Sequence, residues 1–168
     1  MQEQSKQIPL ELEEVDMYVL FARMFAHITR EVEAACGDAG VAAVREGVRK
    51  FGQERGRHIA RRAAAAGHAN DAAHYLSCYD MGRSGYFSSQ DRVEGDTVEQ
   101  TFHKCVFAET WTRDGCEAQG IHYCQMIDPA IAEGYNPAFC CAHDKHFFKD
   151  GQCHFLFTMK QNEKEETT

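Results

Sequence analysis

Side chains that can act as nucleophiles, proton carriers or metal ligands gather in the second half of the chain. Six of the eight cysteines and five of the nine histidines follow residue 100. Thiols and imidazoles are the groups that most readily exchange protons or bind soft metals near neutral pH. We therefore expect any chemistry between about residues 102 and 157. The side chains concerned are those of Cys105, Cys116, Cys124, Cys140, Cys141, Cys153, His103, His122, His143, His146 and His154.

Cys105 lies between a predicted strand, residues 97–104, and a predicted helix, Val106–Arg113. Unpaired N–H groups and the positive end of the helix dipole favour a thiolate at such a position. The alternative is a buried thiol that packs as a small apolar side chain at the strand end.

Cys124 and Asp128 are four residues apart in a segment, 117–127, that we predict to begin as a helix. On one continuous helix they share an apolar face, where an unpaired carboxylate is costly and so suggests function. Pro129 supports the alternative that Asp128 instead caps a new helix. Cys153 shares a face of a predicted strand, 152–158, with two phenylalanines, as a core thiol would.

Two arrangements could hold a metal, but their spacing matches no standard zinc pattern, and there is no Cys-x-x-Cys motif. The sequence leaves open a bound zinc or other divalent metal, and equally a set of scattered surface histidines. The first arrangement joins His103-x-Cys105 to His122-x-Cys124, and the second pairs His143 with His146.

Glycines interrupt a predicted helix in the first half at Gly47, Gly52 and Gly56. Each glycine costs a helix about 1 kcal/mol relative to alanine, and close packing against another helix is the simpler explanation. The alternative is that Arg55, in the same segment, reaches a pocket and grips a substrate carboxylate.

The remaining pattern predicts an α+β fold, with N-terminal helices packed on a small antiparallel sheet and further helices in the C-terminal half. An apolar stripe from Met17 to Val32 predicts a helix that ends at Cys36-Gly37, and Asp71 is a candidate N-cap for a helix over 71–80. Residues 82–89 are rich in turn formers, and 138–148 form a further candidate strand. Asp150-Gly151 predicts a tight turn.

The 168 residues fit one domain, 1–160, with a helical part (about 8–85), a mixed part (about 86–158) and a disordered tail, 161–168. The net charge of -8 argues against a nucleic-acid partner. No apolar run is long enough to span a membrane, and residues 1–14 lack the pattern of a secretory signal. We expect a cytoplasmic protein with reduced thiols.

Several motifs together resemble the L-2-amino-thiazoline-4-carboxylic acid hydrolase family. They are Cys105-Val106-Phe107-Ala108-Glu109, Tyr123-Cys124, Ile127-Asp128-Pro129, Gly134-Tyr135-Asn136-Pro137, and Asp150-Gly151-Gln152-Cys153-His154-Phe155. The glycine–arginine segment 52–59 is also similar to that family. The resemblance extends over about residues 41–157.

The resemblance implies hydrolysis of a carbon–nitrogen bond in a small cyclic amidine or related heterocycle, with ring opening. A thiolate of Cys105 or Cys124 would attack the amidine carbon or orient a water, and Asp128 would act as base or hold the protonated amidine. His103 or His122 would carry the proton. The residues expected to contact the substrate are Arg55, Asn136 and Cys153.

Two other functions fit the same residues. The first is a non-catalytic small-molecule sensor similar to 4-vinyl-reductase-like domains, with a structural zinc held by cysteines. The second is a protein whose exposed thiols respond to metals or to oxidation. In each case the partner is a small molecule, and the sequence leaves open whether copies of the chain associate.

Overall fold

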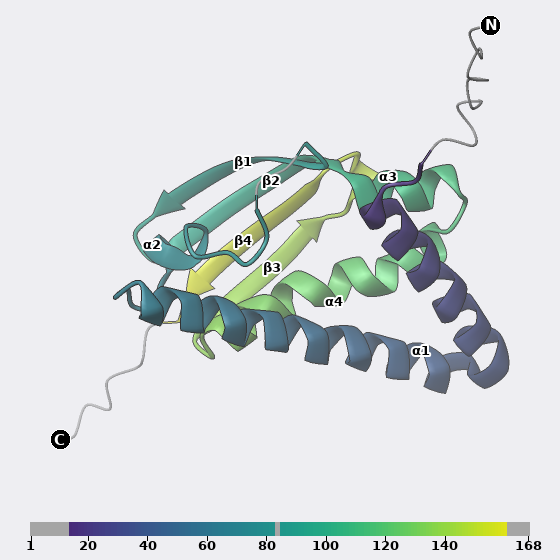
Figure 1. The fold of residues 1–168 in the computed structure, drawn as a ribbon, viewed down its shortest axis with the longest axis horizontal. Coiled ribbons are helices and arrows are strands. Elements are labelled where there is room, and N and C mark those ends of the chain that lie inside the picture. Colours follow the sequence, from purple (N-terminus) through teal and green to yellow (C-terminus); the bar gives the residue numbers. More distant parts are fainter. Residues whose placement is uncertain (1–13, 83–84, 161–168) are drawn as a thin grey trace, which may run out of the picture.

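The computed structural model describes residues 14–82 and 85–160 (Figure 1). The order of elements along the chain is α1 (Met17–Ala65), α2 (Ala72–Tyr75), β1 (Phe87–Glu94), β2 (Thr97–Cys105), α3 (Val106–Arg113), α4 (Glu117–Tyr135), β3 (Phe139–Lys145), α5 (Phe147–Asp150) and β4 (Cys153–Met159). The α+β class is confirmed. The tail predicted to be disordered, 161–168, lies outside the described residues.

The long helix α1 is bent into two arms at Gly37, where the backbone leaves the helical region with φ 57° and ψ -141°. Positive φ is accessible to glycine without steric cost, so the break falls where the sequence predicts a helix end. The segment labelled α1 therefore consists of two helices joined at a kink, as predicted, and Figure 1 shows its two arms meeting at a sharp angle. Asp16 caps its start, accepting a hydrogen bond from the Tyr18 amide at 2.8 Å.

The second arm of α1 lies along α4 because glycines on both helices let the backbones approach closely (Figure 1). A Cβ atom built on Gly52 would lie 2.7 Å from the Ala130 Cβ, and one on Gly56 would lie 2.6 Å from the Tyr135 amide nitrogen. Close packing therefore explains the glycines at 52 and 56, as predicted. Gly47 faces open space and has no such role.

The sheet is antiparallel, with the strand order β1-β2-β4-β3. Its core face carries Val98, Phe155 and Phe157, which are 5% exposed or less. Cys153 lies opposite Phe102 in the ladder and is buried on the same face, as the alternation of β4 predicted. All four strands lie in the C-terminal half, and α3, α4 and α5 are interspersed between them rather than forming a second helical block.

Two local predictions were wrong. Residues 87–89 belong to β1 rather than to a turn-rich passage, because pairing with β2 outweighs the low strand propensity of serine. The helix expected over 71–80 stops at Tyr75, although Asp71 caps it as predicted. Arg62 donates to the Cys78 carbonyl at 3.0 Å and Arg55 binds the Asp80 carboxylate, which pulls this segment out of the helical path.

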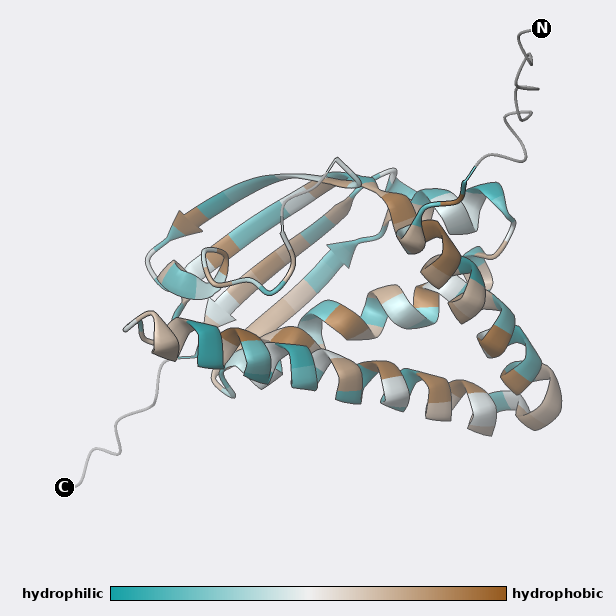
Figure 2. Cartoon of the chain, viewed as in Figure 1, coloured by the Kyte–Doolittle hydropathy of each residue, from teal (hydrophilic) through white to brown (hydrophobic). Residues whose placement is uncertain are grey.

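The two arms of α1 differ in hydropathy. Figure 2 shows the first arm of α1 as apolar over much of its length, whereas apolar and polar residues alternate along the second arm. No helix within the described ranges is long and apolar enough to cross a membrane.

Candidate active site

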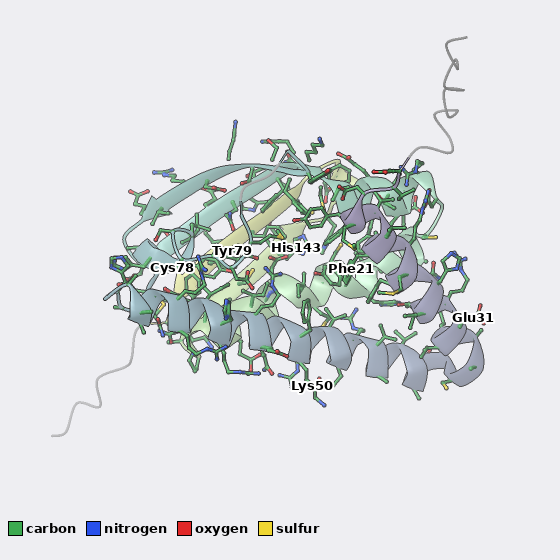
Figure 3. The ribbon with its side chains drawn as sticks, viewed as in Figure 1. Phe21, Glu31, Lys50, Cys78, Tyr79 and His143 are labelled. Carbon is green, nitrogen blue, oxygen red and sulfur yellow. The ribbon has the colours of Figure 1, made fainter. Side chains whose placement is uncertain are left out.

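A cavity of about 500 Å³ lies between the sheet and the helices α1, α3 and α4. Its volume is in the range of pockets that enclose small organic ligands. Figure 3 shows Phe21, Tyr79 and His143 in this space, whereas Glu31 and Lys50 lie on the outside of α1. Much of the wall is aromatic, contributed by Tyr18, Phe21, Phe51, Tyr79, Phe87, Phe102, Phe107, Tyr123 and Phe155.

The cavity brings together four residues expected to form one site: Cys105, Cys124, Asp128 and Cys153. They come from the end of β2, from α4 and from the start of β4. Cys124 and Asp128 share one face because α4 continues from Glu117 to Tyr135 through Pro129. The alternative in which Asp128 caps a new helix is therefore not what the structure shows.

Asp128 presents its carboxyl group to the cavity, with no hydrogen bond or ion pair to any of the described residues. Burial raises its pKa to about 6, although the positive charge of Arg55 opposes the rise. The group is therefore largely ionised at neutral pH and still able to bind and release a proton, which suits a general acid–base. Its charge also acts on the cavity thiols Cys105, Cys124 and Cys153, whose negative forms it disfavours.

The cavity thiols are protonated at neutral pH. Burial raises the pKa of Cys105 to about 11 and that of Cys153 to about 12, and it raises the pKa of Cys124 well above the ordinary value. Only Cys105 stands at the first turn of a helix, where the amides of Phe107 and Ala108 lower its pKa and partly offset burial. All eight cysteines are free thiols.

Arg55 reaches the cavity but is already engaged. Its Nε and Nη2 donate to the two carboxylate oxygens of Asp80 at 3.0 and 2.6 Å. Burial acts to lower the pKa of Arg55, and the Asp80 carboxylate outweighs it, so the arginine stays charged. Its guanidinium also lies 5.4 Å from the centre of the Tyr79 ring and 6.0 Å from that of Phe51. Sequence reasoning gave no signal for this pairing across 25 residues.

His143 lines the cavity, although nothing in its spacing marked it out as a catalytic residue. Both of its ring nitrogens are buried without a hydrogen bond to the described residues. Its ring lies 4.1 Å from Phe155 and 3.8 Å from His146, centre to centre. Burial, followed by the neighbouring His146, lowers the pKa of His143 to about 4, so the imidazole is neutral.

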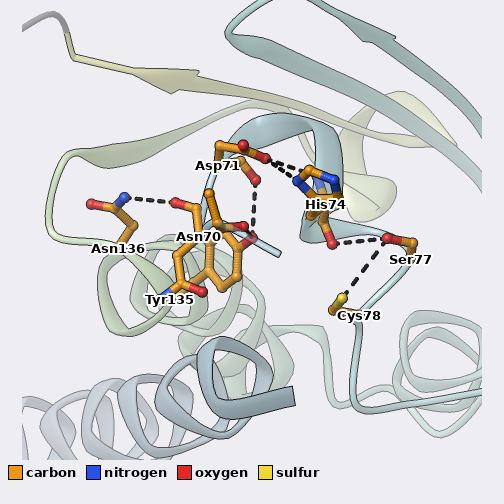
Figure 4. A network of polar contacts seen from close by, with 8 residues as sticks. Asn70, Asp71, His74, Ser77, Cys78, Tyr135 and Asn136 are labelled. Carbon is orange, nitrogen blue, oxygen red and sulfur yellow. Dashed lines mark hydrogen bonds and ion pairs between the residues drawn. The ribbon is translucent and has the colours of Figure 1, made fainter. Parts of the chain in front are cut away.

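Three predicted site residues do not line the cavity. His103 is exposed on β2, and His122 faces Arg45, whose Nη1 is 3.5 Å from its Nδ1. Asn136 has a structural role: it donates to the Asn70 carbonyl at 2.7 Å (Figure 4). It also accepts a hydrogen bond from the Ala138 amide at 2.9 Å. It thus joins the end of α4 to the turn before α2.

Within residues 14–82 and 85–160, no group of three or more His, Cys, Asp or Glu side chains is arranged to hold a metal ion. His103 and His122 do not join the cavity thiols in such a group. His143 and His146 do come together, but only as a pair.

Comparison with known proteins decides the family. A family model described as L-2-amino-thiazoline-4-carboxylic acid hydrolase matches residues 17–157. The chain belongs to this family. The match begins at the first residue of α1, so both arms of that helix are part of the hydrolase-family domain and not only the segment from about residue 41. It also ends within β4, after the last residue that lines the cavity.

The search of curated proteins and the search of solved structures each found no significant match. The family description names a hydrolase of a small heterocyclic molecule, and the cavity has a size suited to one.

Proposed function

We propose that the protein hydrolyses a carbon–nitrogen bond of a small cyclic amidine or related heterocycle and thereby opens the ring. The observation that carries this proposal is Asp128, an unpaired carboxyl group whose pKa is raised to about 6, in a cavity shared with three thiols. A protonated amidine has the charge and the N–H groups to pair with such a carboxylate. Membership of the hydrolase family supports the same reaction.

In this proposal Cys105 is the nucleophile, because it is the cavity thiol held at a helix N-terminus. Its proton passes to the Asp128 carboxylate as the sulfur bonds to the amidine carbon. Proton transfer must accompany attack, because the resting thiol is neutral. Amide donors at the first turn of α3 stabilise the negative charge that develops on sulfur.

Asp128 then returns the proton to the departing ring nitrogen, and the carbon–nitrogen bond breaks. A water attacks the carbon bound to sulfur, Asp128 accepts its proton, and that proton goes back to the Cys105 sulfur as the carbon–sulfur bond breaks. One water is consumed and the enzyme is regenerated. Cys124 and Cys153 form the wall beside the reacting carbon.

The experiment is a screen of cyclic amidines against the wild type and single cysteine variants. Cys105→Ala should lose turnover by about 100-fold or more, as expected when a nucleophile is removed. Cys36→Ala is the matched control, because Cys36 is an exposed thiol on α1 outside the cavity, and it should retain full turnover. Circular dichroism of both variants checks folding.

Intact-protein mass spectrometry adds a second readout, a covalent adduct on Cys105 under single-turnover conditions. If a folded Cys105→Ala variant turns over at the wild-type rate, the nucleophile assignment is wrong. If the wild type binds amidines tightly but converts none, the protein is a small-molecule sensor and not a hydrolase.

A further inference from the structure

The only permanent cation among the described lining residues of the cavity, Arg55, is already neutralised by Asp80. Two parallel hydrogen bonds join the guanidinium to both carboxylate oxygens, and the pair is well buried, with 16% of the arginine side chain and 13% of the aspartate side chain exposed. A bidentate pair of this kind is among the strongest side-chain interactions. A carboxylate on the substrate would have to share the guanidinium with Asp80, which already occupies its Nε and Nη2 and offsets its charge.

The other basic side chain that lines the cavity, His143, carries no positive charge at neutral pH. His143 faces the cavity as a neutral imidazole, because its surroundings are apolar and His146 lies against it. Asp128, by contrast, presents an unpaired negative charge to the same space. The described part of the cavity therefore offers a bound cation a carboxylate partner, and it offers a bound anion no unengaged cation.

Much of the rest of the wall is apolar and aromatic, and its further polar residues, Ser89, Asp91 and Gln100, supply no cation. Phe21, Phe107 and Tyr123 from three different helices have ring centres 5.2 to 5.7 Å apart. Tyr123 and Phe155 line the cavity together with Cys124 and His143. At about 500 Å³ the cavity has room for more than one five-membered ring, and aromatic faces attract both apolar groups and organic cations.

We propose that the substrate of this chain is a cationic cyclic amidine that carries an apolar ring substituent in place of a carboxylate. The cationic ring pairs with Asp128, and the substituent packs against the aromatic wall. The inference rests on the proposed function only in calling this ligand a substrate. As a statement about which ligand binds, it stands on the Arg55–Asp80 pair and the unpaired Asp128.

Three matched compounds test this inference by calorimetric binding to the full chain. They are 2-amino-2-thiazoline-4-carboxylate, the same ring with phenyl in place of the carboxylate, and 4-phenylthiazolidin-2-one, which keeps the phenyl group but is neutral. We expect the phenyl amidine to bind at least about tenfold more tightly than either other compound, which is the range for one charge-assisted hydrogen bond. Equal or tighter binding of the carboxylate compound would overturn the inference.

The variant Asp80→Asn tests the electrostatic cause. Releasing Arg55 should strengthen binding of the carboxylate compound by about tenfold or more and so reduce or reverse the preference. Asp114→Asn is the matched control, because Asp114 forms an ion pair with Arg23 at 2.8 Å away from the cavity, and the preference should not change. If Asp80→Asn leaves the preference unchanged in a folded protein, Arg55 is not what excludes carboxylates.

Turnover of the same compounds separates this inference from the proposed function. Tight binding of the phenyl amidine without conversion would remove the hydrolase proposal and leave the ligand class intact. Faster conversion of the carboxylate compound than of the phenyl amidine would support the hydrolase proposal and overturn the ligand class. Binding of none of the three at millimolar concentration would overturn the ligand class.

Discussion

Replacing Gly56 by alanine tests whether the close approach of α1 and α4 holds the cavity together. A Cβ at this position would lie 2.6 Å from the Tyr135 amide nitrogen and still closer to the Ile131 carbonyl oxygen. Both atoms belong to the backbone of α4, so neither can rotate away. The two helices would have to separate, and α4 carries Cys124 and Asp128.

The expected change in the free energy of unfolding of Gly56→Ala follows from two opposing effects. Alanine in a helix is favoured over glycine by about 1 kcal/mol. Overpacking of a rigid site costs about 1–3 kcal/mol, and here the contact is with backbone, so the upper end applies. We expect a net loss of about 2 kcal/mol in the free energy of unfolding, or a melting temperature lower by about 4–8 °C for a chain of this size.

Gly47→Ala provides the matched control. Gly47 lies within the same arm of α1, and nothing lies within 4 Å of the place that an alanine Cβ would take. Only the propensity gain applies there, so the free energy of unfolding should rise by up to about 1 kcal/mol. Urea unfolding of both variants and the wild type gives the comparison. If Gly56→Ala is as stable as Gly47→Ala, the helices do not pack as closely as described.

Two further predictions concern surface features of the fold. Asp71→Ala should lower the free energy of unfolding by about 1 kcal/mol in urea titrations, because it removes the cap at the start of α2, and an unchanged midpoint would contradict that role. His154 pairs with Asp144 at 2.5 Å and Glu99 at 3.1 Å, which raise its pKa, so its stabilising effect should be present at acidic pH and be lost as the pH rises through the folded pKa. His154→Gln should therefore be less stable than the wild type at about pH 6 but not at about pH 9, and a difference that does not vary with pH would contradict the ion pairs.

Local signals in the sequence predicted much of the fold. Gly37 marked the break in α1, Asp71 marked a helix cap, and the alternation around Cys153 marked the buried face of β4. Each of these features depends on a few neighbouring residues, through positive φ, a capping side chain or a two-residue period. The convergence of Cys105 and Asp128 was expected only from motifs found together in a known family.

Features that depend on distant partners were missed. Strand β1 is poor in strand-forming residues and exists because β2 pairs with it. Asp80 lies outside the helix predicted for it because it pairs with Arg55, 25 residues away. His143 was considered only as a metal ligand beside His146, and its position in the cavity was missed because it is set by the register of β3 against β4. His103 was chosen for its place beside Cys105, but it is the extra residue where the register of β2 against β1 shifts, and its side chain is exposed.

The most direct test of the proposed chemistry is Asp128→Asn, measured for turnover and for stability in one preparation. Burial raises the pKa of Asp128 from 3.8 to about 6, so holding its charge in the folded protein costs about 3 kcal/mol at neutral pH, at about 1.4 kcal/mol per pH unit. Because the folded pKa lies above the unfolded one, this cost appears as the pH rises from about 4 to 6 and is almost fully present at about pH 7.

The neutral asparagine removes that cost and also removes the base. We predict that Asp128→Asn melts at a higher temperature than the wild type at about pH 7 but loses amidine turnover by about 100-fold or more. The wild type should lose kcat/KM as the pH falls below about 6. A folded Asp128→Asn variant that keeps wild-type turnover would contradict the central claim that this carboxyl group is the acid–base of the site.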